Sequence, residues 1–322
     1  MWWRKRSTET TAEAARYISA TQELPAAFLS RLQWTVLRPL AQHLGGSERS
    51  LIHGPGIELS EVREYQPGDD IRHIDWNITA RTDQPHIREA YVDRALDVWL
   101  VLDMSASVDW GTAQCLKRDR ALEFAAVIGQ LLGRHGNRVG ALLFANQPLP
   151  FVRPASGRAH ILQILSRIRE EQATRHNGAT DLAAALTQFD VVVRRRALVI
   201  IMSDFLVPDN WHHIMLRLSQ RHETVAVRLY DPREADLPDV GLVTLEDPET
   251  GSQFVANTSD RKLRERFRQA AQEQTEQIRQ KILRCGVDYL MLRTDQELLP
   301  TMMRFLGSRR ERRRMRGQQR AG

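Results

Sequence analysis

The chain has 322 residues, 42% of them hydrophobic, enough for one large domain or two smaller ones. No apolar run approaches the roughly 18 residues of a membrane span, which argues against a membrane-spanning protein. The two cysteines, Cys115 and Cys285, form no disulfide framework, and no apolar segment of a secretory signal follows the basic start of the chain. Both features favour a cytoplasmic location.

The positive charge gathers at the C-terminus. The stretch from Arg309 to Arg320 holds seven arginines and one glutamate, which equals the whole net charge of +6. The rest of the chain is neutral, so we expect no basic surface for nucleic acid outside this tail. Residues 307–322 have few apolar side chains and are predicted to be disordered. Nucleic-acid binding through the tail remains an alternative function, and its affinity would fall steeply with salt.

Residues 1–23 are polar and mixed, and we predict a flexible N-terminus. Trp2 and Trp3 precede three basic residues, a composition that also suits a membrane interface. A peripheral position at the inner face of the membrane is therefore an alternative. Residues 24–94 are expected to form a smaller part with one helix, from Pro25 to Leu44, and a few strands.

A long polar motif lies between Arg63 and Arg81 and reads R-x-Y-x-P-G-D-D-x-R-x-I-D-W-x-x-x-A-R. Its centre is typical of a turn. Its charged and aromatic residues could form a partner-binding surface, or could pair with one another inside a turn, because carboxylates at this density need partners. The residues in question are Asp69, Asp70, Arg72, Asp75, Trp76 and Arg81.

Residues 95–306 alternate between apolar runs typical of buried strands and segments with helical spacing. This alternation predicts an α/β fold, a doubly wound and mostly parallel sheet, with a short β-hairpin insertion between Asp231 and Thr258. In such sheets ligands bind beyond the carboxyl ends of the strands.

Oxygen-bearing side chains stand at those ends. Asp103, Ser105 and Ser107 follow the apolar run from Val98, Asp204 follows a second run, and Thr180 stands at a helix entry. One carboxylate and two hydroxyls in D-x-S-x-S suit a hard divalent cation such as Mg²⁺, with Mn²⁺ or Ca²⁺ as alternatives. The other interpretation is that these residues only form hydrogen-bonded turns and bind no ion.

The order D-x-S-x-S, then Thr, then Asp resembles the metal-ion-dependent adhesion site of von Willebrand factor A domains. The motif between Arg63 and Arg81, followed by D-x-S-x-S and by Asp231-Pro232-Arg233-Glu234, resembles the "domain of unknown function 58" family over about residues 45–306. The first resemblance implies that Ser105, Ser107 and Thr180 contact the ion directly and that Asp103 and Asp204 act mostly through water.

The family resemblance implies a non-catalytic, metal-dependent adaptor that works with a MoxR-type AAA+ ATPase and its client protein in chaperone-like maturation. An acidic residue of a partner would complete the coordination of the metal. The sequence holds no H-E-x-x-H, G-x-S-x-G or phosphate-binding loop. A metal-dependent hydrolase with Asp103 as nucleophile is the alternative, weakened because Ser105 stands where a second carboxylate would be needed.

Overall fold

The structure is a computed structural model. It describes residues 2–3, 61–65, 71, 74–82, 84–89, 96–133, 137–146, 149, 151–174, 178–246 and 252–321. The chain divides into two compact units, one of residues 47–96 and one of residues 1–46 with 97–322. The expected helix from Pro25 to Leu44 lies outside the described residues.

The main unit is built on a six-stranded sheet with the order β11-β8-β7-β4-β5-β6. The parallel strands are β4 (Asp97–Asp103), β5 (Arg138–Phe144), β7 (Ala197–Ser203), β8 (Glu223–Tyr230) and β11 (Asp288–Arg293). The edge strand β6 (Val152–Ala155) pairs antiparallel with β5. The predicted α/β fold with a mostly parallel sheet is confirmed, and the antiparallel edge is an addition to it.

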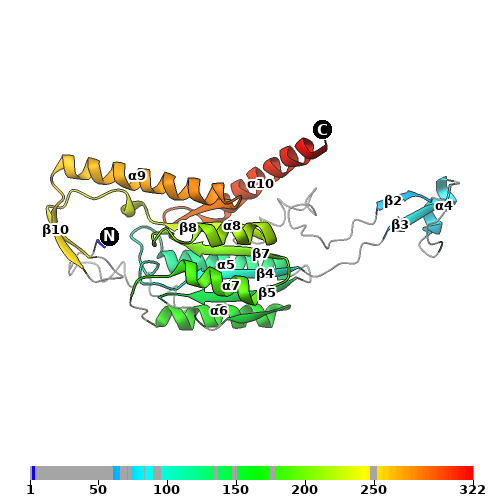
Figure 1. Ribbon diagram of the computed structural model, residues 1–322, viewed down its shortest axis with the longest axis horizontal. Coiled ribbons are helices and arrows are strands. Elements are labelled where there is room, and N and C mark those ends of the chain that lie inside the picture. The colour runs from blue at the N-terminus through cyan, green and yellow to red at the C-terminus, as the bar shows by residue number, and fades with distance from the viewer. Residues whose placement is uncertain are drawn as a thin grey trace. The chain divides into compact units, whose positions relative to one another are not determined.

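Helices cover both faces of this sheet because successive residues of each strand point to opposite sides. Helices α7 (Leu182–Val192), α8 (His212–Arg221) and α9 (Arg261–Arg284) share one core cluster with the strands. Helix α5 (Lys117–Gly133) packs against α6 (Arg158–Ala173) and α10 (Leu298–Ala321) on the other face. Figure 1 shows the long helix α9 running from above strand β10 to the sheet, where its buried residues Ile278 and Ile282 pack.

The hairpin insertion is confirmed as β9 (Leu242–Glu246) and β10 (Gln253–Asn257), which pair antiparallel. Trp2 and Trp3 belong to the stretch predicted to be flexible, but they form strand β1 and pair with β9. The prediction of a flexible segment is therefore wrong at these two residues. The physical reason is that an edge strand such as β9 offers unpaired backbone groups to any extended segment that reaches it.

The prediction of a disordered tail from residue 307 is also wrong, because α10 continues through Ala321. Arg309 is buried, and its guanidinium forms ion pairs with Asp288 (Nε–Oδ2, 2.7 Å) and with Glu223. Arginine favours helix, and two carboxylates at the amino ends of β8 and β11 hold this one against the sheet. Within the described residues, no helix is long and apolar enough to span a membrane.

The smaller unit contains a two-stranded antiparallel hairpin, β2 (Glu61–Glu64) with β3 (His86–Glu89), and the short helix α4 (Trp76–Thr82) between them. Strands β2 and β3 agree with the few strands expected in residues 24–94.

Candidate functional site

The site lies where the winding of the sheet reverses. Taken in chain order, the six strands follow the order of classic doubly wound sheets, in which the first and fourth strands are neighbours. Here those strands are β4 and β7, paired in parallel from Asp97↔Ala197 to Leu102↔Met202. Helix α5 follows β4 on one face and α8 follows β7 on the other, and in sheets of this kind ligands bind at the carboxyl ends of these two strands. Asp103 ends β4, and Asp204 directly follows β7.

Asp103 is fully buried and fixes the turn that follows β4. Its Oδ1 accepts a hydrogen bond from the Ser105 backbone N–H at 2.9 Å, and its Oδ2 accepts one from the Ser203 hydroxyl at 2.7 Å. Burial, and then the nearby Asp204 carboxylate, raise the pKa of Asp103 to about 7. Two buried carboxylates in close proximity require positive charge if both are to be ionised.

The hydroxyls of D-x-S-x-S face one another. Ser105 Oγ and Ser107 Oγ are 3.0 Å apart, and both residues are buried. The Ser107 hydroxyl also lies near the Asp204 carboxylate and helps to lower the pKa of that group. The predicted residues Asp103, Ser105, Ser107 and Asp204 are therefore joined in one set of contacts, although they come from two separate segments.

The turn after β7 is held in an uncommon conformation. Phe205 has a φ of 57°, the left-handed region that bulky residues rarely adopt. Its backbone N–H donates to the Ser203 hydroxyl at 3.0 Å, and the Leu206 N–H donates to Asp204 Oδ1 at 3.0 Å. Such conformations cost on the order of 1–3 kcal/mol and concentrate at functional sites. The hydrogen bond from Leu206 fixes the Asp204 carboxylate within this turn.

A buried lysine completes the site, and the sequence analysis missed it. Lys117, on the first turn of α5, is 0% exposed, and its Nζ lies 2.9 Å from Asp204 Oδ2 and 2.8 Å from Glu234 Oε1. Burial disfavours the ammonium, but Asp204 and Glu234 outweigh it and raise the pKa of Lys117. Burial likewise opposes ionisation of Asp204, yet Lys117 holds the pKa of that carboxyl below its usual value. Burial raises the pKa of Glu234 to about 7 despite the ammonium.

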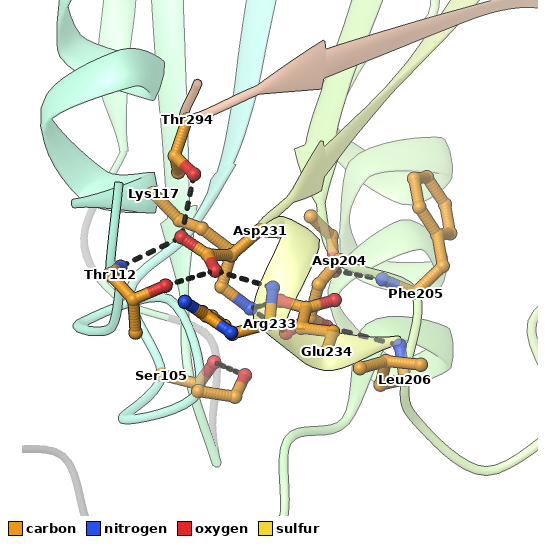
Figure 2. A network of polar contacts seen from close by, with 12 residues as sticks. Ser105, Thr112, Lys117, Asp204, Phe205, Leu206, Asp231, Arg233, Glu234 and Thr294 are labelled. Atoms are coloured by element: carbon orange, nitrogen blue, oxygen red, sulfur yellow. Dashed lines mark hydrogen bonds and ion pairs between the residues drawn. The ribbon is translucent and has the colours of Figure 1, made fainter. Parts of the chain in front are cut away.

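Glu234 reaches Lys117 because a short 3₁₀ helix, η4 (Pro232–Glu234), is anchored at its start by Asp231. Asp231 is fully buried and accepts hydrogen bonds from the Thr112 N–H (2.8 Å), the Thr112 hydroxyl (2.7 Å), the Thr294 hydroxyl (2.6 Å) and the Arg233 N–H (2.9 Å). Figure 2 shows this carboxylate between the loop after β4 and the end of β11. The segment Asp231-Pro232-Arg233-Glu234 therefore ties three strand ends together.

Thr180, the remaining predicted ligand, is buried at the neighbouring strand end. The next residue, Asp181, caps α7 by accepting from the Ala184 N–H at 2.8 Å, and its own N–H donates to Ala145 O just beyond β5. Gly178, with a φ of 110°, makes the turn into this segment. The structure thus places Thr180 at the same edge of the sheet as Asp103, one strand away.

The second predicted cluster lies in the smaller unit. Asp75 caps α4, since its Oδ1 accepts from the Asn77 N–H at 3.1 Å and from the Ile78 N–H at 3.2 Å. Trp76 is 71% exposed, and Arg81 is also exposed. Asp75 therefore has a structural role, whereas Trp76 faces solvent. Asp69, Asp70 and Arg72 lie outside the described residues.

The donor set at the sheet edge suits a hard divalent ion by its chemistry. Hydroxyls of Ser105 and Ser107 stand beside two carboxylates, and the raised pKa of Asp103 marks a deficit of positive charge. No group of three or more His, Cys, Asp or Glu suited to a metal occurs within the described ranges, so an ion would depend on the hydroxyls. The one ammonium at the site, Lys117, shares Asp204 with any such ion.

The chain resembles other proteins over most of its length. Residues 61–277 match the family described as "Protein of unknown function DUF58". Uncharacterized proteins of Mycobacterium bovis and Mycobacterium tuberculosis are each 43% identical over 286 residues, which is 88% of this chain and 90% of theirs.

Several solved structures also align with the fold. An aerotolerance-related membrane protein of Bacteroides fragilis aligns with a TM-score of 0.44 and 15% identity, covering 66% of this chain and 100% of that one. BatB of Bacteroides thetaiotaomicron aligns with a TM-score of 0.39 and 14% identity, covering 66% and 96%. The manganese-loaded TRAP protein of Plasmodium vivax aligns with a TM-score of 0.29 and 22% identity, covering 42% and 57%.

Proposed function

This chain belongs to the DUF58 family of proteins of unknown function, and we propose that it is a non-catalytic adaptor that binds a partner protein through a divalent metal ion. The observation that carries the proposal is the contact set of Asp103, Ser105, Ser107 and Asp204 at the switch point of the sheet. A bound Mg²⁺ or Mn²⁺ would offer an open coordination position, which a partner's Asp or Glu can fill.

The residues of the chain divide this work between them. The hydroxyls of Ser105, Ser107 and Thr180 would contact the ion, and as neutral ligands they leave its charge available to a partner. Asp103 would hold the loop and, with Asp204, bind the ion mostly through water. Lys117 neutralises part of the charge of Asp204. The ammonium would therefore lower the affinity of the site for the ion, and it stabilises the buried carboxylate when no ion is bound.

The class of partner protein is taken from the family resemblance alone. We propose that the chain acts in the cytoplasm with a MoxR-type AAA+ ATPase and its client protein, in chaperone-like maturation or assembly. The catalytic alternative lacks support, since Asp103 already accepts hydrogen bonds from Ser105 and Ser203 and has no second carboxylate two residues on.

The test is the metal dependence of partner binding. Full-length protein is immobilised, and the MoxR-type ATPase of the same host is passed over it in Mg²⁺ or in EDTA. We expect binding in Mg²⁺ only, and at least about tenfold weaker binding for Ser105→Ala and Thr180→Ala, a loss of about 1.4 kcal/mol. Asp109→Ala is the control, because Asp109 is half exposed and pairs with Arg118 at 2.5 Å. Binding that survives EDTA and Ser105→Ala would refute the ligand role.

A further inference from the structure

A cavity of about 320 Å³ lies between the carboxyl end of β8 and helix α9. Its charged lining residues are Arg228 of β8 and Glu234 of η4. Leu206, Phe267, Ala270 and Ala271 supply its apolar wall. This volume is at the small end of the range for ligand pockets in proteins.

The positive group in the cavity lacks a full set of partners. Arg228 is 2% exposed, and its Nε has no hydrogen-bond partner in the part of the chain that the structure describes. One long contact joins its Nη1 to the Thr275 carbonyl at 3.4 Å, and its guanidinium lies 5.6 Å from the centre of the Tyr230 ring. A buried guanidinium without a carboxylate is costly, so this arrangement indicates an anionic group that binds there.

The negative group is likewise incompletely paired. The Glu234 side chain is 6% exposed, and its Oε1 lies 2.8 Å from Lys117 Nζ. Its Oε2 accepts no hydrogen bond from any residue that the structure describes. Arg228 and Glu234 line the same cavity, yet no ion pair joins them within the described ranges. The cavity therefore presents a cationic donor and an anionic acceptor at two separate points.

Part of the remaining wall is apolar, and Tyr230, Gln274 and Thr275 complete the lining. Leu206 comes from the turn after Asp204, and Figure 2 shows it beside Glu234. Phe267 and Ala271 come from α9 and stand one turn apart. A ligand that satisfies this lining carries an anion, a cation and a short apolar group.

We propose that this cavity binds a free α-amino acid with an apolar side chain. Its carboxylate would accept from Arg228, its ammonium would donate to Glu234, and its side chain would pack between Leu206 and Phe267. The ligand is neutral overall, which suits a cavity with one charge of each sign. This inference does not rest on the metal-dependent adaptor role, since Ser105, Ser107 and Thr180 do not line the cavity. The two sites are joined only through Lys117, which pairs with both Glu234 and Asp204.

The first experiment titrates the full-length protein with three probes by isothermal calorimetry. L-Leucine carries both charged groups, N-acetyl-L-leucine keeps the carboxylate alone, and L-leucinamide keeps the ammonium alone. We expect saturable binding of leucine at one site and at least about tenfold weaker binding of each derivative, because N-acetyl-L-leucine loses the contact with Glu234 and L-leucinamide loses the contact with Arg228. If leucine did not bind, the cavity would hold only water. If either derivative bound as tightly as leucine, the contact that this derivative lacks would not contribute to binding. Either result overturns the proposal.

The second experiment tests the residues. Arg228→Met and Glu234→Gln should each weaken leucine binding at least about tenfold, whereas Arg293→Met should leave it unchanged. Arg293 is the matched control, since its guanidinium lies 5.5 Å from the centre of the same Tyr230 ring but does not line the cavity.

A third variant guards against loss of fold. Ala271→Leu keeps both charges and fills the cavity with an apolar side chain, so it should abolish leucine binding while the melting temperature is kept. Undiminished leucine affinity in Ala271→Leu, with the protein folded, would place the ligand elsewhere and overturn the assignment.

Discussion

The buried ammonium of Lys117 allows the sharpest test of the site. In Lys117→Met the side-chain volume is nearly kept and the charge is lost, so Asp204 and Glu234 remain buried without their cation. At the Nζ–Oδ2 distance of 2.9 Å, the attraction between Lys117 and Asp204 is about 6 kcal/mol for an effective dielectric of about 20. Removing the ammonium also removes its own desolvation cost, so the net loss is smaller, roughly 3–5 kcal/mol.

This loss is expected to lower the melting temperature by roughly 10 °C in a unit of this size. The assay is thermal and urea unfolding in EDTA. Lys281→Met is the matched control, because Lys281 also pairs with an aspartate, Asp209, but is 38% exposed. The pair at the surface should contribute at most about 1 kcal/mol. If both variants were equally stable, the reasoning from burial would be wrong.

Divalent metal gives the same variant a second readout. In the proposed metal site Lys117 would share Asp204 with the ion. Its removal leaves a more negative site, so Mg²⁺ should bind Lys117→Met at least about tenfold more tightly than the wild type. Mg²⁺ should then restore part of the lost melting temperature, because a ligand that binds only the folded state stabilises it. Equal calorimetric affinity in both proteins would refute competition between the ammonium and the ion.

Three further outcomes are expected. The pKa of Asp103 is raised from its ordinary value of 3.8 to about 7. Between these two pH values the folded protein keeps a proton on Asp103 that the unfolded chain has released. The stability of the metal-free protein should therefore fall as pH rises towards and through 7, and urea unfolding in EDTA should show a flatter profile for Asp103→Asn. Arg309→Ala should cost roughly 2–3 kcal/mol, because it breaks two ion pairs of a buried guanidinium. Arg293→Ala is the comparison, because it breaks only the partly exposed pair with Asp295 and should cost less than about 1 kcal/mol. If Arg309→Ala and Arg293→Ala lost the same free energy of unfolding in urea, the docking of α10 through Arg309 would be contradicted. Asp231→Ala should lower the melting temperature by several degrees and increase amide exchange at Thr112, whose N–H would lose its acceptor; unchanged exchange there would show that the loop is held by other contacts.

Much of the fold and part of the site could be predicted from local patterns. The run from Val98 to Leu102 is apolar on both faces, which only a central strand of a covered sheet requires, and all five residues are buried. Because carboxyl ends of parallel strands share one edge, Asp103 and Asp204 could be placed together although a hundred residues separate them.

The amino-acid sequence by itself therefore determined the sheet, its hairpin insertion and the edge at which the oxygen-bearing side chains meet. Only the tertiary structure decided which charges are taken out of water. Lys117 stands in a polar helix start and Glu234 in a surface-like turn, and nothing in either local pattern distinguishes them from solvated residues. Both residues are buried because η4 packs over the first turn of α5, a contact between segments more than a hundred residues apart. The free energy of a charged side chain depends on such burial and on the charges around it. A contact distant in sequence also accounts for the burial of Arg309, which was predicted to lie in a disordered tail but pairs with Asp288 at the sheet.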